Sequence, residues 1–525
     1  MNCETESRRG STALLFTLFF ITLFALHLPV LRLPYFWDEG GYYVPAARDL
    51  WLTGSLIPHS TPSNAHPPLV MAYLALAWKI FGYAPVVTRT AMLAVAAFSL
   101  LGLFRLAQRV ANTPVAIATI ICTAIYPVFF SQSSLAHVDL AAAGLSWWGI
   151  LAYIEDRKLA MVTWLSLAAL AKETAILAAG ALSAWELLRM FLKPELSDAG
   201  ESRRPRFLLL APLLPLAAWY AYHYHRTGFV FGNPEFFRYN VQATVQPLRI
   251  LIAIFLRSWQ VLAYLNLYFL TLAALFAMFR SPVADRGIER KRIALPVQIA
   301  FLSIITAYVL AMAVIGGAVL ARYMLTAVPL VIMVSVSTIR RRVRLWPVVI
   351  AIVTFTFVVG IFVNPPYGFS VEDNLAYRDY IRLHQAAETY LETRAPMARV
   401  LTAWPASSEL TTPELGFNTR PMKVVRIENF TAEQLFAAAE LRPQFDYALV
   451  FSTKYQPPNA WFAHWNAWQR WKTEFFDYHR DLPPAAAAQI LGGEIIYEQH
   501  RKGQWIAVIE MTGIEEAQAR APTRP

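Results

Sequence analysis

Long apolar runs are the feature that most constrains the fold of this chain. Runs of about twenty residues recur from Thr12 to about residue 363 and then stop. An α-helix of about 20 apolar residues crosses the hydrocarbon core of a bilayer. The composition agrees, because 57% of the residues are apolar and only 15% are charged, and soluble domains carry more charge. We therefore predict a polytopic α-helical membrane protein, with a transmembrane domain over 1–363 and a second domain over 364–525.

About eleven spans are expected from the apolar runs. They are about 12–32, 86–104, 113–131, 139–154, 159–171, 174–191, 207–222, 259–279, 294–315, 323–338 and 345–363. The first run is interpreted as a retained span, because it is longer than a signal-peptide core and no small-residue cleavage site follows it. Residues 247–258 are expected to form a separate surface helix.

Short basic clusters between the runs predict how the spans are threaded. The clusters are Arg8-Arg9, Arg105 to Arg109, Arg157-Lys158, Arg203 to Arg206, Arg286 to Arg292 and Arg340 to Arg344. Cytoplasmic loops of membrane proteins are enriched in Lys and Arg, so the net charge of +11 needs no nucleic-acid partner. Placing every cluster inside puts the N-terminus in the cytoplasm and the C-terminal domain outside. It also requires the apolar stretch 66–81 to lie at the outer surface, within an outer loop over 33–84.

After Asn364-Pro365-Pro366 the pattern changes to alternating helices and strands. A helix is expected over 372–393, and strands over 399–404, 423–427, 447–451, 494–498 and 504–510. This alternation predicts an α/β domain that is soluble and lies in the periplasm or outside the cell. The two cysteines, Cys3 and Cys122, are too few for a disulfide framework or a paired-cysteine metal site.

Two adjacent carboxylates follow the first span. Asp38 and Glu39 lie in the stretch Trp37-Asp38-Glu39-Gly40-Gly41-Tyr42-Tyr43. Ionisable groups beside a bilayer are costly, so they indicate a functional site by default. The alternative is a pair of ordinary interfacial loop carboxylates.

A second acidic position lies at the outer end of the third predicted span. Asp139 follows His137 closely, and the predicted threading places it on the same side of the membrane as Asp38. Two outward acidic sites between apolar helices suggest a shared cavity. A helix N-cap at the start of the fourth span also accounts for Asp139.

Basic and polar residues at the outer ends of other spans could complete such a cavity. Lys172 and Glu173 interrupt an apolar stretch, Arg322 and Tyr323 open the tenth span, and His66 starts the surface helix. An arginine on the outer side needs a compensating anion, and a lipid phosphate meets its planar fork through two hydrogen bonds. Each of these positions also has a purely structural explanation. Lys172 and Glu173 could form a short outer turn, Arg322 could anchor the helix to lipid headgroups, and His66 could be a solvated residue at a helix start.

These residue types suit transfer of a sugar from a polyprenyl phosphate. The leaving phosphate is already a stable anion, so one carboxylate is enough, as the general base on an acceptor hydroxyl. Asp38 is assigned that role. Cations must then hold the phosphate and its growing charge, which we assign to Arg322, Lys172 and His66. A single displacement predicts inversion at the anomeric carbon, without the two carboxylates of a glycosidase.

The order and sidedness of these motifs resemble those of the GT-C glycosyltransferases. The quoted motifs are Trp37-Asp38-Glu39, His66-Pro67-Pro68-Leu69, Asp139 and Arg322-Tyr323-x-Leu325. The bacterial family 39 type is the most similar; it includes protein O-mannosyltransferases and lipid A aminoarabinose transferases. The resemblance covers about residues 10–340 and implies a lipid-phosphate sugar donor.

The resemblance also implies roles for single positions. Asp38 matches the catalytic carboxylate of the family, with Glu39 beside it, and Asp139 matches its second acidic site. Arg322 matches the basic residue that meets the lipid phosphate. His66 falls where the aminoarabinose transferases have a lysine, and Gly41 where they have an arginine. The resemblance therefore supports the superfamily more than that one activity.

The leading hypothesis is a multi-pass glycosyltransferase of the inner membrane. Its partners are a polyprenyl-phosphate sugar donor, a glycan, lipid or protein acceptor, and the bilayer. No cofactor is required, although Asp38, Glu39 and Asp139 could bind a divalent cation. The alternative is a non-catalytic transporter or flippase of lipid-linked sugars, which should show inverted repeats and charges in mid-span; the sequence shows neither.

Overall fold

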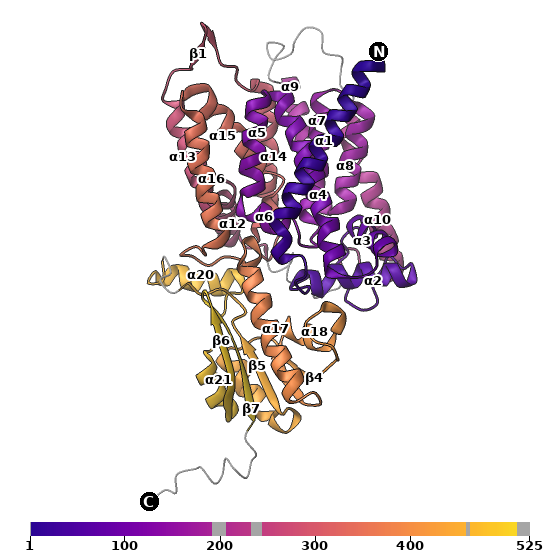
Figure 1. Cartoon of the computed structure of the whole chain (residues 1–525), viewed down its shortest axis with the longest axis vertical. Helices are drawn as coiled ribbons and strands as arrows, with labels where there is room; N and C mark the ends of the chain where they lie inside the picture. The colour runs from indigo at the N-terminus through magenta and orange to yellow at the C-terminus, as the bar shows by residue number, and fades with distance from the viewer. Residues whose placement is uncertain (1, 192–205, 233–243, 458–461, 512–525) are drawn as a thin grey trace, which may run out of the picture. The chain divides into compact units, whose positions relative to one another are not determined.

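The computed structural model describes residues 2–191, 206–232, 244–457 and 462–511 (Figure 1). The chain forms two compact units. The first comprises Met1–Leu31 and Pro45–Val363, and the second comprises Arg32–Val44 and Asn364–Pro525.

The first unit is built almost entirely of helices (Figure 1). They are α1 (Asn2–His27), α2 (Val44–Thr53), α3 (Leu69–Phe81), α4 (Pro85–Val110), α5 (Thr113–Ile125), α6 (Pro127–Gln132), α7 (Asp139–Ile154), α8 (Lys158–Ala171), α9 (Ile176–Phe191), α10 (Leu213–Thr227), α12 (Pro247–Leu262), α13 (Leu267–Met278), α14 (Leu295–Val314), α15 (Val328–Arg342) and α16 (Trp346–Phe362). A two-stranded hairpin of β1 (Ala284–Asp285) and β2 (Ile288–Glu289) connects α13 to α14.

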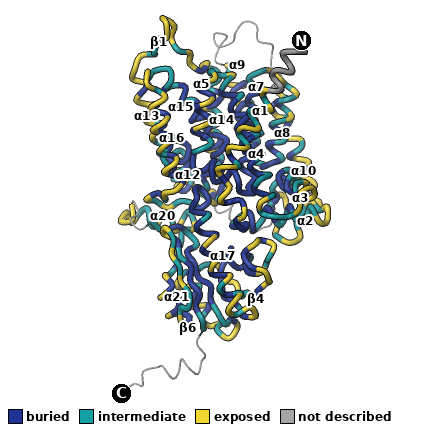
Figure 2. Tube along the Cα trace, in the orientation of Figure 1, coloured by how far each residue is buried: buried dark blue, intermediate teal, exposed yellow. Residues whose placement is uncertain are grey.

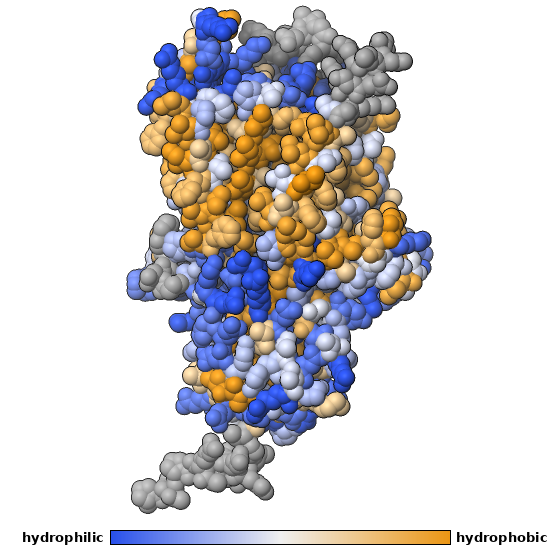
Figure 3. Space-filling view, in the orientation of Figure 1, coloured by the Kyte–Doolittle hydropathy of each residue, from blue (hydrophilic) through white to orange (hydrophobic). Residues whose placement is uncertain are grey.

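Apolar side chains form a broad band over the helices of this unit (Figure 3). Six helical segments in the described part of the chain are long and apolar enough to cross a membrane, and five shorter apolar helices accompany them. The chain is therefore a multi-pass membrane protein. The number of crossings, predicted as about eleven, stays a prediction.

Two predicted spans are interrupted in the structure. The expected helix 113–131 breaks between α5 and α6, where Tyr126 has an extended ψ of 125° before Pro127, because proline restricts the preceding residue. The expected surface helix 247–258 and span 259–279 are instead α12 and α13. They are separated where Leu265 and Asn266 adopt positive φ angles of 45° and 71°.

Helices α4 and α7 pack closely against one another at Gly144. A Cβ added at Gly144 would overlap the Ser99 hydroxyl and lie 3.0 Å from Ser99 Cα. Such a backbone approach leaves no room for a side chain. Along the same interface the Trp148 indole N–H donates to the Phe98 carbonyl at 3.1 Å. These contacts hold α7, which carries Asp139 at its first residue.

Basic residues of two predicted inner loops gather at the hairpin end of this unit. Arg290 donates to the Arg340 carbonyl at 2.7 Å, and Arg341 pairs with Glu289 at 3.2 Å. Figure 3 shows hydrophilic atoms at the end that carries β1. Arg340 and Arg341 lie in the last turn of α15, whereas Arg322 lies before its first residue. This helix has 15 residues and is therefore about 22 Å long. The two sets of arginines are thus separated as the threading predicted, while the side that faces the cytoplasm stays a prediction.

The second unit is an α/β structure around a five-stranded mixed sheet. Its strands are β3 (Arg399–Ala403), β4 (Lys423–Ile427), β5 (Tyr447–Phe451), β6 (Gly493–Arg501) and β7 (Gln504–Met511), in the order β4-β3-β5-β7-β6. β3 runs parallel to β4 and β5, while β7 is antiparallel to β5 and β6. Strands β3 and β5 are almost wholly buried (Figure 2), as expected for parallel strands covered on both faces.

Helices surround this sheet. They are α17 (Ala376–Arg394), α18 (Ala406–Thr411), α19 (Ala432–Glu440), α20 (Asn466–Phe476) and α21 (Pro484–Leu491). α17 packs on β6 and β7, and α21 packs on β5, β6 and β7. The five predicted strands and the predicted helix over 372–393 are thus present, with bounds that differ by a few residues.

The segment Arg32–Val44 belongs to the second unit, which corrects its assignment to the transmembrane domain. The Tyr35 amide donates to the Leu415 carbonyl at 2.9 Å. The Phe36 ring stacks on Tyr377 with centroids 5.7 Å apart, and both rings are fully buried. Such long-range packing between distant segments has no local signal in the sequence.

Candidate active site

The Asp38 turn is part of the second unit and rests on aromatic rings. Trp37 adopts a positive φ of 52°, and its ring packs against Trp404 at 4.9 Å and Tyr380 at 6.0 Å between centroids. Asp38 is half-buried and precedes a π-helical turn over Glu39–Tyr43 that leads into α2. A non-glycine residue at positive φ is costly, so this packing fixes the backbone that presents Asp38.

Glu39 lies on the inner side of that turn. Its side chain is fully buried, and its Oε2 accepts a hydrogen bond from the Phe36 amide at 3.4 Å. A carboxylate in this position stabilises the turn that precedes it. Of the two predicted carboxylates, Asp38 is therefore the more accessible one.

Gly41 allows Trp404 to approach the turn. A Cβ at Gly41 would lie 3.1 Å from Cζ2 of Trp404, closer than ordinary van der Waals contact. The position at which the sequence departs from the aminoarabinose transferases is therefore filled here by a tryptophan ring of the second unit.

Asp139 forms ion pairs with two cations in the first unit. Its Oδ1 lies 2.5 Å from Lys172 Nζ, and its Oδ2 lies 3.3 Å from Arg322 Nε. The three side chains are at most 5% exposed. Removing charges from water is expensive unless they are paired, so each member of this cluster depends on the others.

Three helix ends bring these residues together. Asp139 is the first residue of α7. Lys172 follows α8 with an extended backbone (φ −155°, ψ 133°), which turns the chain toward α9. Arg322 lies in a 3₁₀ turn over Ala321–Met324, just before α15. The predicted span 323–338 thus begins later than expected, and Arg322 lies in a turn instead of a helix.

Cationic groups surround the Tyr323 ring. Lys172 Nζ lies 4.0 Å from its centroid, and the guanidinium carbons of Arg257 and Arg322 lie 5.5 Å and 5.6 Å away. Electron-rich ring faces attract cations at such distances. We call Lys172, Arg257, Arg322 and Tyr323 the cation cluster. Asp139 is its paired carboxylate.

Arg257 was not predicted, and with Arg249 it organises the backbone that leads to Arg322. Arg257 donates to the carbonyls of Ala318 and Leu320 at 3.1 Å and 2.8 Å. Arg249 donates to the Gly316 carbonyl at 2.6 Å. Both arginines are buried, and their spacing of eight residues places them on one face of α12. That spacing is the signal in the sequence for two buried arginines within 247–258, the segment predicted as a surface helix.

The remaining predicted residues border the cation cluster. His137 Nδ1 lies 2.7 Å from Gln132 Oε1 and 3.4 Å from a terminal nitrogen of Arg322. His66 Nδ1 lies 2.8 Å from Glu173 Oε2, next to Lys172 in sequence. The structure thus brings His137, Lys172 and Arg322 around Asp139, and pairs His66 with Glu173.

The catalytic and binding roles assigned to these residues stay predictions. Asp38 and Glu39 belong to the second unit, and Asp139 to the first. Two cations already neutralise Asp139, which disfavours a divalent cation at its carboxylate. That cation also stays a prediction.

Comparisons with known proteins support the fold. Searches with the sequence find no matching family model and no matching curated protein. Among solved structures, ArnT from Cupriavidus metallidurans bound to undecaprenyl phosphate is similar, with a TM-score of 0.52 and 14% sequence identity, covering 94% of this chain and 97% of that chain. ArnT in the apo state gives a TM-score of 0.50 at 14% identity, covering 93% and 97%. The GT-C fold predicted from the motifs is therefore confirmed.

Proposed function

We propose that this protein is an integral-membrane glycosyltransferase. It transfers a sugar from a polyprenyl-phosphate donor to a hydroxyl acceptor at the outer face of the inner membrane, with inversion. The main support is the cation cluster: three buried cations around Tyr323, two of which, Lys172 and Arg322, pair with the carboxylate of Asp139. A solved structure of the similar fold contains undecaprenyl phosphate.

The cation cluster is suited to the phosphate of the donor. Asp139 contributes one negative charge against the three positive charges of Lys172, Arg257 and Arg322, and the neighbouring carboxylate of Glu173 pairs with His66. A phosphate oxygen would meet these cations in a water-poor place, where charge-assisted hydrogen bonds are strong. As the sugar leaves, the charge on the phosphate grows, and donors fixed in advance stabilise that charge at no cost of reorganisation. Asp139 orients Lys172 and Arg322 for this task.

Asp38 is proposed as the general base. The acceptor oxygen attacks the anomeric carbon while the bond from that carbon to the phosphate oxygen breaks. The acceptor proton passes to the Asp38 carboxylate, and the bonding electrons leave with the polyprenyl phosphate. Glu39, which is buried and accepts the Phe36 amide, holds the turn. His66 and Glu173 act as a pair beside Lys172, and His137 supports Arg322.

The test is transfer from defined polyprenyl-phosphate sugars by the purified protein in detergent or nanodiscs. We expect wild-type protein to release polyprenyl phosphate and to form a glycosylated product of inverted configuration. Asp38→Asn should transfer about 10²–10⁴-fold more slowly and still bind the donor. Glu414→Gln, also in the second unit, serves as the matched carboxylate control and should remain active.

Two results would overturn the proposal. One is full transfer activity in Asp38→Asn, which would remove the base. The other is movement of the intact donor across vesicles without any cleavage of its phosphate bond, which would favour the flippase.

A further inference from the structure

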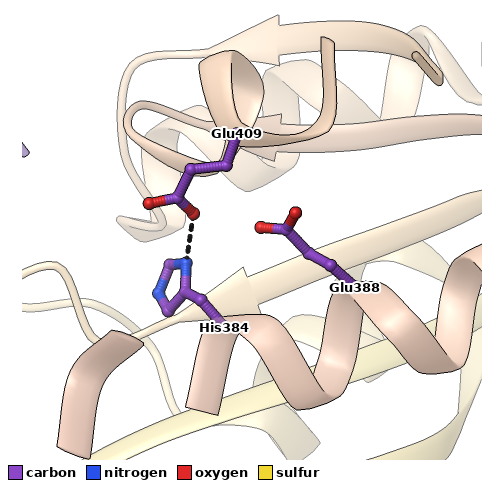
Figure 4. A group of neighbouring side chains, drawn as sticks. All are labelled: His384, Glu388 and Glu409. Atoms are coloured by element: carbon purple, nitrogen blue, oxygen red, sulfur yellow. Dashed lines mark hydrogen bonds and ion pairs between the residues drawn. The ribbon is translucent and has the colours of Figure 1, made fainter. Parts of the chain in front are cut away.

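Three ionisable side chains converge in the interior of the second unit. His384 and Glu388 lie one turn apart on α17, and Glu409 lies on α18 (Figure 4). One ligand atom of each lies within 4.8 Å of the others. Their exposed fractions are 1%, 0% and 1%, so all three are withdrawn from water. None of them belongs to the Asp38 turn or to the cation cluster.

The burial of the Glu388 carboxyl group is not explained by hydrogen bonds to the rest of the described chain. Neither of its carboxylate oxygens meets a donor at hydrogen-bond geometry among the residues that the structure describes, and the side chain placed to share a proton with it, Glu409, is itself a carboxyl group. Its carboxyl group points toward the other two side chains (Figure 4). Across the cluster, His384 Nδ1 lies 2.6 Å from Glu409 Oε2, and the second oxygen of Glu409 also has no partner within the described chain. Buried polar groups are normally satisfied, so three carboxylate oxygens here call for a ligand.

The charges at the cluster point to a cation. The charged side chains that act on Glu388, Glu409 and Glu392, are both acidic. Two carboxylates in a dry interior repel one another, and a positive ion between them removes both the repulsion and the unsatisfied acceptors.

We propose that His384, Glu388 and Glu409 bind a divalent metal ion, with Zn²⁺ as the best match. Zinc is commonly bound by imidazole nitrogen and carboxylate oxygen in sites with few ligands. Calcium and magnesium prefer six or more oxygen ligands, which three side chains do not supply. On binding, the hydrogen bond between His384 and Glu409 is replaced by one bond from each group to the metal, and the proton that the pair shared is released.

Such an ion would tie α17 to α18, the two helices on which the Asp38 turn rests. The Tyr380 ring stacks on His384 with centroids 4.2 Å apart and also contacts Phe36 and Trp37 at 6.0 Å. Trp404, which packs on Trp37, lies two residues before α18. The metal therefore has a structural role, and its loss should loosen the segment 32–44.

The experiment uses the full-length protein in detergent, stripped with a chelator and then titrated with Zn²⁺ or Co²⁺. We expect wild-type protein to retain, after desalting, one more zinc per chain than Glu388→Gln, measured by elemental analysis. The affinity measured against a chromophoric chelator should fall at least 10-fold in Glu388→Gln. Glu433→Gln, an exposed position on α19, is the matched control and should bind as the wild type does.

Two further measurements keep the test independent of folding defects in the variants. Co²⁺ added to wild-type protein should give the absorption bands of a four-coordinate site made by one imidazole nitrogen, two carboxylate oxygens and a water, absent before addition. Stripping wild-type protein should also speed tryptic cleavage after Arg32, and zinc should reverse this. Equal zinc retention by wild type and a folded Glu388→Gln, or no Co²⁺ spectrum in wild type, would refute the metal site. Neither readout depends on glycosyl transfer.

Discussion

Arg322 illustrates how a residue acquires its properties from its neighbours. In the sequence it is an arginine at the predicted outer end of a membrane helix, where Lys and Arg are less common than at the cytoplasmic end. In the structure its guanidinium pairs with Asp139 and lies near the Tyr323 ring and His137. Its backbone belongs to a turn that follows residues 316–320, and Arg249 and Arg257 donate hydrogen bonds to carbonyls of that segment. The planar fork of arginine, with donors in fixed directions, is suited to bridging a carboxylate and a phosphate.

Replacing Arg322 should therefore affect transfer according to what the new side chain retains. Arg322→Gln, which removes the charge, should slow transfer by about 10²–10³-fold, as loss of a preorganised donor does. Arg322→Lys keeps the positive charge but lacks the planar guanidinium group, and its rate of transfer should fall about 10-fold. Steady-state kinetics with a polyprenyl-phosphate sugar measure both, with the exposed Arg280→Gln as control. Equal rates for wild type and Arg322→Gln would contradict a role at the phosphate.

Among the elements, regular helices and strands could be predicted well, and their interruptions could not. α7, β4 and β5 have the bounds that the apolar pattern predicts, because each continues one periodicity between clear breaks. The break at Leu265 and Asn266 lies in apolar sequence without glycine or proline. Tertiary packing decides such a kink. The same holds for Arg257, whose carbonyl partners lie over fifty residues away.

The contact between α4 and α7 should tolerate no side chain at Gly144. Gly144→Ala would place its Cβ 2.5 Å from Ser99 Cβ, so the helices must separate, at a cost of about 1–3 kcal/mol or more. We expect a lower unfolding temperature in detergent and, because α7 carries Asp139, weaker donor binding. Gly180→Ala on α9, which meets nothing within 4 Å, is the matched control.

The double variant Ser99→Gly with Gly144→Ala restores the space and should recover part of the lost stability. An unchanged unfolding temperature in Gly144→Ala alone would show that α4 and α7 are not held this closely.

On the scale of the whole molecule, a division after residue 363 could be predicted from the loss of apolar runs. That the second unit also includes Arg32–Val44 could not be predicted, because its partners Tyr377, Trp404 and Leu415 lie more than 300 residues further along the chain. The cluster of His384, Glu388 and Glu409 was missed for a related reason. Its helical pair has a visible spacing of four, but Glu409 joins it only in the folded structure.

Deleting residues 364–525 should release the Asp38 turn. Without Leu415, Tyr377 and Trp404, the segment 32–44 loses the hydrogen bond and ring packing described above. Trypsin should then cleave after Arg32 at least ten times faster than in the full-length protein, as followed by mass spectrometry. Cleavage after Arg286, in the hairpin of the first unit, should keep its rate. Unchanged protection of Arg32 would mean that the first unit alone holds the segment.

The division of the second unit into two stretches of chain also sets an order of events during synthesis. Residues 32–44 leave the ribosome early, but the strands and helices that enclose them follow only after residues 45–363. At about 5–20 residues per second, those 319 residues take roughly 16–64 s. Throughout that interval Tyr35, Phe36 and Trp37 have none of their final neighbours from the second unit. The catalytic turn proposed here can therefore mature only after the membrane helices have been made, so a prematurely terminated chain would remain inactive.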